Sequence, residues 1–251
     1  MRTIAIIQAR MGSSRLPGKV LVDITGKSML QRVIERVAAA PSVDAIVVAT
    51  TNTREDDILA EYMKNEVNCD VFRGPVNDVL ARFYECAKLH RAELVVRVTA
   101  DDPLKDSQII EKAISIMRRN PNLDYCSNTI EPSYPEGLDI EVMRFSALER
   151  AHVEAKLLSE REHVTPYIWK QPDQFNVLNF KSDRDLKGWR WTVDKPEDLE
   201  FMRHIFKEFK DRPLVPYQDV IVWLDANPEV QQINSGISRN EGYIKSIKVE
   251  N

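Results

Sequence analysis

The first half of the 251-residue chain alternates short apolar runs with helical patterns, and this alternation restricts the fold more than any other feature. The apolar runs have the length of strands, whereas the segments between them carry apolar residues at helical spacing. The strand-like runs are Thr3–Gln8, Ala45–Ala49, Asp70–Phe72 and Leu94–Val98, and the helical patterns are Met29–Ala39, Arg54–Lys64 and Asp78–Leu89. This order predicts an α/β fold with a doubly wound, mostly parallel sheet, because right-handed crossovers place helices on both faces.

The second half is less regular, and no repeat, low-complexity tract or linker divides it from the first. Helical patterns lie at Ser107–Arg119, Ser146–Ala155, Arg161–Trp169, Glu197–Glu208 and Asp219–Ala226, and strand-like runs lie at Leu123–Cys126, Leu138–Met143 and Asn176–Phe180. We therefore expect a single domain over residues 1–251, with a segment inserted on the substrate side at about 125–190. Residues 231–251 form a polar, weakly patterned C-terminal tail.

Composition and charge argue against several classes of protein. Apolar residues make up 43% and charged residues 29% of the chain, which is ordinary for a soluble globular protein. The net charge of −4 leaves no cationic surplus for nucleic acid, and no run approaches the roughly 18 apolar residues of a membrane span. The first strand begins too early for a signal peptide, and three widely spaced cysteines without ligand spacing indicate reduced thiols. These features predict a cytoplasmic protein that binds neither nucleic acid nor a membrane.

A cationic loop with two glycines and two serines follows the first apolar run directly, and its cations are Arg10, Arg15 and Lys19. In α/β folds such a loop holds a polyphosphate, because backbone N–H groups and fixed cations meet the anion at the carboxyl end of the first strand. A solvated basic surface loop is the alternative, but like charges this close repel one another unless an anion lies between them. The expected nucleotide contacts are Ala9, Arg10, Gly12, Ser13, Ser14, Arg15 and Lys19.

The spacing of this loop differs from the two common phosphate-binding motifs. A P-loop needs G-x-x-x-x-G-K followed by Ser or Thr, whereas five residues separate Gly12 from Gly18 and Val20 follows Lys19. The G-x-G-x-x-G fingerprint of dinucleotide-binding folds is absent as well. The loop therefore belongs to another class of nucleotide site.

Acidic residues follow two further strand-like stretches. Asp101 and Asp102 come after Leu94–Val98, and Asp194 ends another stretch just before Pro196. In a doubly wound sheet such strand ends face the same crevice as the first loop. Carboxylates there suit Mg²⁺, which usually takes one or two of them together with phosphate oxygens. Adjacent residues of an extended chain point in opposite directions, so Asp101 and Asp102 are expected to do different jobs, unless these acids only cap the following turn or helix.

These motifs resemble a known family. The loop is similar to the N-terminal signature (I/V)-x-A-R-x-x-S-x-R-L-P-G-K of the cytidylyltransferases that activate acidic sugars, and IIQARMGSSRLPGKVL looks most like the branch named after a spore-coat polysaccharide biosynthesis protein. Val193–Leu199 resembles the family's later motif (I/V)-D-x-P-E-D-L. The resemblance implies a Rossmann-like sheet of the GT-A type and a magnesium-dependent nucleotidyltransferase. It also implies that CMP passes from CTP to a sugar-acid or sugar-like acceptor, with release of pyrophosphate, in cell-surface or spore-coat polysaccharide biosynthesis.

The same resemblance assigns roles to the cations and acids. It makes Asp101 and Asp194 the ligands of Mg²⁺, beside the α-phosphate that the acceptor oxygen attacks in line. Arg10, Arg15 and Lys19 hold the β- and γ-phosphates and, with Asp101, form the expected catalytic set. Where the family often has G-D-C-P-L, this chain has an aspartate, Asp102, in place of the cysteine. Whether Asp102 tunes the metal or contacts the acceptor stays open.

Two other strings are similar to acceptor-side motifs of the spore-coat branch. Residues 135–141 resemble P-x-G-x-D-(V/I)-E, and residues 161–168 resemble R-E-H-V-T-P-Y-I. The resemblance implies an acceptor pocket lined by Glu136, Asp139, Glu141, Arg161, Glu162 and His163. From the residues alone, acidic alternation is also typical of a half-exposed strand, on which Asp139 and Glu141 share a face, and a helical histidine is more often structural than catalytic.

The base is the least specified part of the expected site. Relatives recognise it near the stretch that contains Arg73 and Asn77, although a solvated arginine and a plain N-cap explain these two residues equally well. The tail string Asn240-Glu241-Gly242-Tyr243 also recurs in the spore-coat branch, and the sequence offers no physical account of it.

Two other functions fit a nucleotide-binding α/β fold. A glycosyltransferase of this architecture usually carries D-x-D after a central strand, and that spacing is absent at Asp101-Asp102-Pro103. A catalytically inactive nucleotide-binding module would not be expected to keep three cations together with both strand-end acids. The family analogy is also compatible with a homodimer, but no apolar patch can be located from the sequence.

Overall fold

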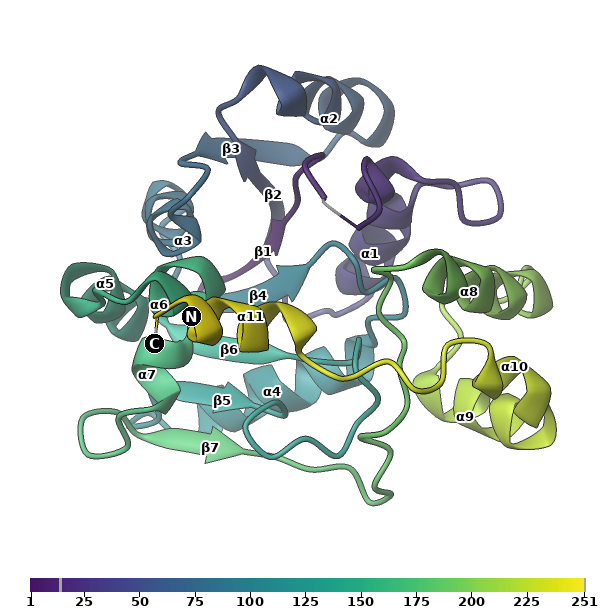
Figure 1. Ribbon diagram of the computed structural model, residues 1–251. Helices are drawn as coiled ribbons and strands as arrows, with labels where there is room; N and C mark the ends of the chain where they lie inside the picture. Colours follow the sequence, from purple (N-terminus) through teal and green to yellow (C-terminus); the bar gives the residue numbers. More distant parts are fainter. Residues whose placement is uncertain (14, 251) are drawn as a thin grey trace.

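A seven-stranded sheet forms the centre of the molecule (Figure 1). The computed structural model describes residues 1–13 and 15–250. The strands are β1 (Thr3–Gln8), β2 (Ala45–Thr51), β3 (Asp70–Gly74), β4 (Leu94–Thr99), β5 (Tyr125–Ser127), β6 (Glu141–Arg144) and β7 (Val177–Asn179). Their order is β3-β2-β1-β4-β6-β5-β7, and β6 runs antiparallel to both of its neighbours, whereas the other pairings are parallel. This arrangement confirms the mostly parallel α/β sheet expected from the sequence.

Helices cover both faces of the sheet. The α-helices are α1 (Met29–Ala38), α2 (Asp57–Tyr62), α3 (Val79–Leu89), α4 (Ser107–Arg119), α5 (Phe145–Glu154), α6 (Leu158–His163), α7 (Pro166–Trp169), α8 (Pro196–Glu208), α9 (Tyr217–Ala226), α10 (Pro228–Gln232) and α11 (Glu241–Glu250). Short 3₁₀ turns η1 (Lys19–Leu21) and η2 (Arg54–Asp56) and a π turn η3 (Met63–Val67) complete them. One hydrophobic cluster lies between the sheet and α1, α4 and α8, and a second lies between the sheet and α3, α5 and α7.

The central strand β1 shows why the sheet is buried on both sides. Ala5 and Ile7 belong to the first cluster and Ile4 and Ile6 to the second, because successive side chains of a strand point to opposite faces. All four side chains are fully buried. A near-continuous apolar run is therefore required here, which is typical of parallel strands.

Several boundaries differ from those expected. The helix predicted over Arg161–Trp169 is divided into α6 and α7, because Val164 between them has a left-handed φ of +72°. Asp78 caps α3 by accepting a hydrogen bond from Ala81 N at 2.9 Å, so the N-cap is not Asn77, one residue earlier. Asp106 likewise caps α4, by accepting hydrogen bonds from the backbone N–H groups of Gln108 and Ile109. In both cases the preferred cap is an aspartate, whose carboxylate also suits the helix dipole.

The C-terminal tail is more ordered than its weak patterning predicts. It contains the helix α11, which packs against α6 and lies in front of β4 and β6 in the view of Figure 1. The tail therefore covers part of the edge at which the sequence places the acceptor. No helix among residues 1–13 and 15–250 is long and apolar enough to cross a membrane.

Candidate active site

Three distant segments meet at the ammonium group of Lys19. Its Nζ lies 2.9 Å from Asp101 Oδ2, 2.8 Å from Asp194 Oδ1 and 2.9 Å from the carbonyl oxygen of Val193. Lys19 follows the loop after β1, Asp101 follows β4, and Asp194 precedes α8. The structure thus brings together the loop cation and the two acids that the sequence singled out. The strand expected to end at Asp194 does not form, because this stretch pairs only through an isolated bridge at Arg190.

This cluster is ionised at neutral pH. Burial favours the neutral carboxyl of Asp101, but the adjacent Lys19 ammonium holds the pKa of Asp101 at about 2. Burial also opposes the charge on Lys19, yet Asp101 and Asp194 together raise the pKa of Lys19 above its ordinary value. The charged forms of Lys19 and Asp101 therefore stabilise each other at neutral pH.

The donor set fits Mg²⁺, provided that a substrate supplies further ligands. Asp101 and Asp194 each provide a hard oxygen atom, at 2.9 and 2.8 Å from Lys19 Nζ. Among the described residues, no group of three or more His, Cys, Asp or Glu side chains is placed to hold a metal ion. A magnesium ion commonly takes one or two carboxylates from the protein and completes its shell with phosphate oxygens and water, so two acids are enough.

Arg15 joins the cluster from the loop side. Its Nη2 lies 2.6 Å from Asp194 Oδ1, and its Nη1 lies 3.2 Å from Glu241 Oε2, on the first turn of α11. Glu241 also pairs with Lys195 at 3.2 Å. The tail string that the sequence could not explain therefore reaches the cationic loop after β1.

The rest of the loop forms a compact turn. The N–H groups of Ser13 and Gly18 both donate to the Met11 carbonyl, at 2.8 and 3.0 Å, and Ala9 N donates to Ala49 O at 3.2 Å. Gly12 is exposed beside Glu55, where an added Cβ would come within 3.3 Å of its carboxylate. Arg10 is exposed as well, and Ser14 lies outside the described residues.

Asp102 points away from Lys19. It accepts a hydrogen bond from Thr99 Oγ1 at 2.7 Å and pairs with buried Lys105 at 2.8 Å. Lys105 also donates to the carbonyl oxygen of Asp139. Asp102 is therefore tied to the acceptor-side segment, and its contact with the acceptor stays a prediction.

A buried arginine that the sequence did not single out organises the acids around Asp194. Arg190 lies 2.6 Å from Glu136 Oε2, 3.1 Å from Asp194 Oδ2 and 2.9 Å from Asp198 Oδ1. Asp198 also accepts the backbone N–H groups of Asp194 and Lys195, at 2.9 and 3.0 Å. The position of Asp198, in the first turn of a helix that begins with proline, is a capping signal that could have identified it.

The three acceptor-side acids bind different partners. Glu136 accepts the Asn240 N–H at 2.8 Å, and Asp139 pairs with Arg239 from the tail. Glu141 pairs with Arg97 and accepts hydrogen bonds from Tyr125 and Thr165, at 2.6 and 2.5 Å. Because β6 begins only at Glu141, Asp139 is not on a strand and does not share a strand face with it.

Residues 161–163 lie at the end of α6 and join this helix to its neighbours. Arg161 forms a two-point ion pair with Asp78 and donates to the His152 carbonyl at 2.7 Å. Glu162 and His163 both contact the Ser246 hydroxyl, at 2.7 and 3.0 Å, so they join α6 to α11. These contacts give the three residues a structural role, and their contact with the acceptor stays a prediction.

The two candidate contacts to the base lie in β3 and between β3 and α3. Arg73 donates to the carbonyl oxygens of Thr51 and Thr53, at 2.9 and 2.7 Å, and pairs with Asp57 at 2.6 Å. It therefore braces β3 against β2, although the residue itself is exposed. Asn77 is exposed just before the cap of α3. Recognition of the base by either residue stays a prediction.

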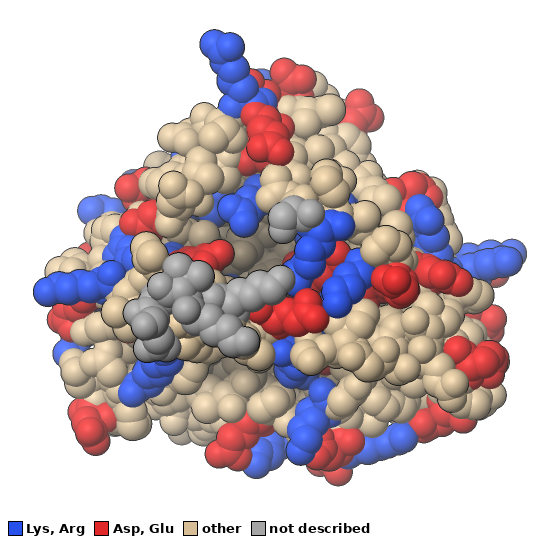
Figure 2. All heavy atoms as spheres, viewed as in Figure 1, with Lys and Arg blue, Asp and Glu red and all other residues tan. Residues whose placement is uncertain are grey.

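The face that carries these residues is hollowed, and the rim of the hollow shows both basic and acidic side chains (Figure 2). A model of the cytidylyltransferase family matches residues 4–221, which spans the loop, β4 and the Asp194 motif. The chain belongs to the cytidylyltransferase family.

Similar proteins agree with this assignment. The cytidylyltransferase is 38% identical over 245 residues to an uncharacterized protein of Methanocaldococcus jannaschii, covering 97% of this chain and 98% of that protein. It is 29% identical to the spore coat polysaccharide biosynthesis protein SpsF of Bacillus subtilis, covering 89% of this chain and 94% of SpsF.

Solved structures extend the likeness to three dimensions. A cytidylyltransferase from Leptospira borgpetersenii superposes with a TM-score of 0.89 and 32% identity, covering 95% of this chain and all of that one. The CMP:2-keto-3-deoxy-manno-octonic acid synthetase complexed with CTP shares the fold, with a TM-score of 0.65, 20% identity and coverage of 83% of this chain and 99% of that one.

The stability of this cytidylyltransferase is expected to depend on the protonation of Glu136. Burial raises the pKa of Glu136 from 4.5 to about 7, although Asn240 and Arg190 oppose the rise. Between these values the folded chain binds more protons than the unfolded chain, so this carboxyl contributes less to stability as the pH rises. The Tm of Glu136→Gln minus that of the wild type should therefore increase between about pH 5 and about pH 8. A difference independent of pH would show that the pKa is not raised.

Proposed function

We propose that this cytidylyltransferase transfers CMP from CTP to an oxygen of a sugar-acid or sugar-like acceptor and releases pyrophosphate. The convergence of Asp101 and Asp194 on Lys19 is the observation that carries the proposal. The names of SpsF and of the CMP:2-keto-3-deoxy-manno-octonic acid synthetase favour a role in polysaccharide biosynthesis and an acidic sugar as acceptor.

The reaction needs charge and position more than covalent chemistry. Lys19 and Arg15 face the phosphates of CTP from the loop side, and Arg190 and Asp198 fix the orientation of Asp194. When Mg²⁺ is bound, Asp101 and Asp194 would hold it, and the ion would neutralise charge that develops on the phosphate oxygens. The acceptor oxygen attacks the α-phosphorus in line and the P–O bond to pyrophosphate breaks.

Calorimetry with a panel of nucleotides tests this proposal. We expect CTP to bind more tightly than UTP, GTP or ATP, and to bind more weakly when Mg²⁺ is removed. Asp101→Asn should reduce CTP affinity in the presence of Mg²⁺, because one of the two converging carboxylates loses its charge. Preference for another triphosphate would keep the mechanism but change the product. Binding restricted to a nucleotide sugar would contradict nucleotidyl transfer and favour a glycosyltransferase.

A further inference from the structure

We propose that Arg82, together with Arg10, binds the triphosphate of the nucleotide and forms a second anion site near the carboxyl end of β1. Arg82 lies on the first turn of α3, outside the motifs of the cationic loop. The inference deepens the proposed function and rests on it only for the identity of the nucleotide.

Two nitrogen atoms of the buried Arg82 guanidinium have no hydrogen-bond partner among the described residues. The side chain is 3% exposed, and the two atoms are Nε and Nη1. Leaving a buried cation uncompensated costs several kcal/mol. Native proteins rarely leave such groups unpaired unless a ligand supplies the missing partner.

The nearest carboxylates are already occupied. Asp56 accepts hydrogen bonds from Met11 N at 2.7 Å and from the backbone and hydroxyl of Thr51. Asp78 pairs with Arg161 and caps α3. Neither acid forms a direct ion pair with Arg82 in the described part of the chain, so its positive charge is only partly balanced.

A second cation increases this excess of positive charge. Burial, and then the like charge of Arg10, lower the pKa of Arg82 to about 10, which still leaves it protonated at neutral pH. Arg10 itself has no ion pair within residues 1–13 and 15–250. Lys19 and Arg15, by contrast, are each bound to carboxylates. Arg10 and Arg82 are therefore the cations of this edge that an incoming anion can pair with directly.

The end of β3 makes room for the Arg82 side chain. A Cβ added at Gly74 would lie 3.1 Å from Arg82 Cγ and 3.1 Å from Phe72 Cε1. These are tighter than ordinary contacts, and Arg82 Cγ is close to the backbone, where the side chain has little freedom to move. The glycine thus lets the arginine stem pass the strand end toward the loop after β1.

The chemistry of the pair points to phosphate. A guanidinium presents its N–H donors in a planar fork that matches the oxygens of a phosphate group. Arg10 stands at the carboxyl end of β1, where α/β sheets bind the phosphates of nucleotides. The triphosphate, and not the acceptor carboxylate, is therefore the anion that we assign to Arg82.

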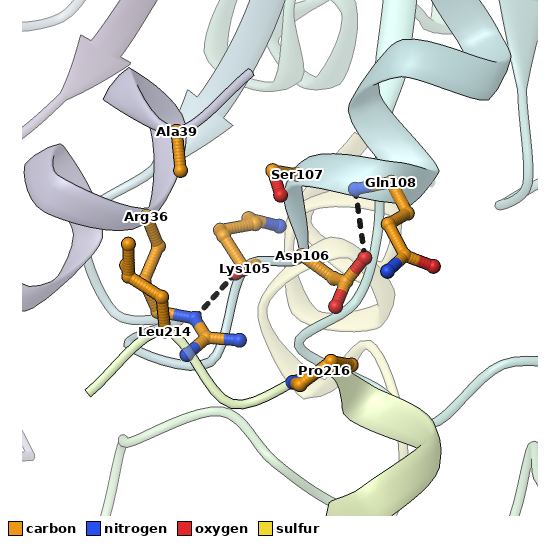
Figure 3. A pocket seen from close by; sticks show the side chains of 8 residues that line it. All are labelled: Arg36, Ala39, Lys105, Asp106, Ser107, Gln108, Leu214 and Pro216. Carbon is orange, nitrogen blue, oxygen red and sulfur yellow. Dashed lines mark hydrogen bonds between the residues drawn. The ribbon is translucent and has the colours of Figure 1, made fainter. Parts of the chain in front are cut away.

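Arg36 provides a matched control (Figure 3). It is also 3% exposed, but it donates to the carbonyl oxygens of Lys105, Pro213 and Val215, at 2.5, 2.9 and 2.8 Å. The cavity beside it has a volume of about 20 Å³, which is room for roughly one water molecule. Arg36 is thus a buried arginine with backbone partners and a structural role.

Calorimetry with CTP and with inorganic tripolyphosphate tests the proposal on wild type, Arg82→Met and Arg36→Met. For Arg82→Met we expect both ligands to bind roughly 10- to 100-fold more weakly, because hydrogen bonds to a charged group are lost. The Tm without ligand should stay unchanged or rise, since an unpaired buried cation is removed. Arg36→Met should lower the Tm, because three carbonyl groups lose their donor, and should leave tripolyphosphate affinity unchanged.

The outcomes separate this proposal from the proposed function. Arg82-dependent binding of tripolyphosphate without any CTP binding would support the anion site and contradict cytidylyl transfer. Unchanged affinity for both ligands in Arg82→Met, or a rise only in the KM for the acceptor, would overturn the assignment. If Arg82→Met does not fold, Gly74→Ala replaces it, and displacement of the Arg82 stem should weaken tripolyphosphate binding. Wild-type affinity in a folded Gly74→Ala protein would then count against the site.

Discussion

Replacing Lys19 with alanine is expected to lower the rate of pyrophosphate release at saturating CTP about 10²–10³-fold. In the proposed reaction the Lys19 ammonium faces the phosphates, and it also holds Asp101 and Asp194 together, at 2.9 and 2.8 Å. Without it, Arg15 and Arg190 remain as cations on Asp194, and Asp101 loses its ion pair. The variant therefore loses a cation for the transition state and the positions of both acids.

Lys27→Ala is the control for this experiment. Lys27 lies a few residues further along the same segment and pairs with Glu35 at 2.5 Å, away from the cluster. The Lys27→Ala variant should release pyrophosphate at the wild-type rate. That result would show that loss of a nearby lysine alone has no effect. Near-normal turnover of Lys19→Ala would remove Lys19 from the mechanism.

Arg190→Met is expected to lower the free energy of unfolding by about 3–5 kcal/mol, the usual loss when one partner of a buried ion pair is removed. Glu136, Asp194 and Asp198 would then lose their shared cation in a buried setting. Urea denaturation followed by tryptophan fluorescence measures this loss, because buried Trp191 adjoins the network.

Arg184→Met is the control, because it removes an arginine from an ion pair at the surface. Arg184 pairs with Asp225, but both side chains are about half exposed, so little change in stability is expected. If Arg190→Met unfolds at the wild-type urea concentration, the three acids have found other donors and Arg190 does not organise the site.

The parts of this structure that local pattern determines were predictable from the sequence. Apolar runs and helical spacing located the parallel strands, and the loop after β1 and Asp101 after β4 were expected at the same edge of the sheet. The rule that strand ends share one edge of a parallel sheet needs no knowledge of distant contacts. That rule accounts for the meeting of Lys19 with Asp101, whereas Asp194 reaches the cluster from a stretch that is not a strand.

Contacts between distant segments could not be predicted in this way. Arg15 and Glu241 are 226 positions apart, and their pairing depends on where the tail packs. Arg82 fits the amphipathic pattern of α3, so nothing in its neighbourhood indicates that it lacks a partner. The antiparallel strand β6 is too short, at four residues, to reveal its direction. Tertiary packing decides each of these features.

The order of the strands has a consequence for the assembly of the protein during synthesis. The four strands β3-β2-β1-β4 all come from the first 99 residues, so this half of the sheet can pair before the rest of the chain exists. Asp194 and Arg190 are made much later, as is β6, which pairs with β4. The first half of the chain therefore contains Lys19 and Asp101 but neither Asp194 nor Arg190, and the cluster of charges is complete only once residues 190–194 have been made.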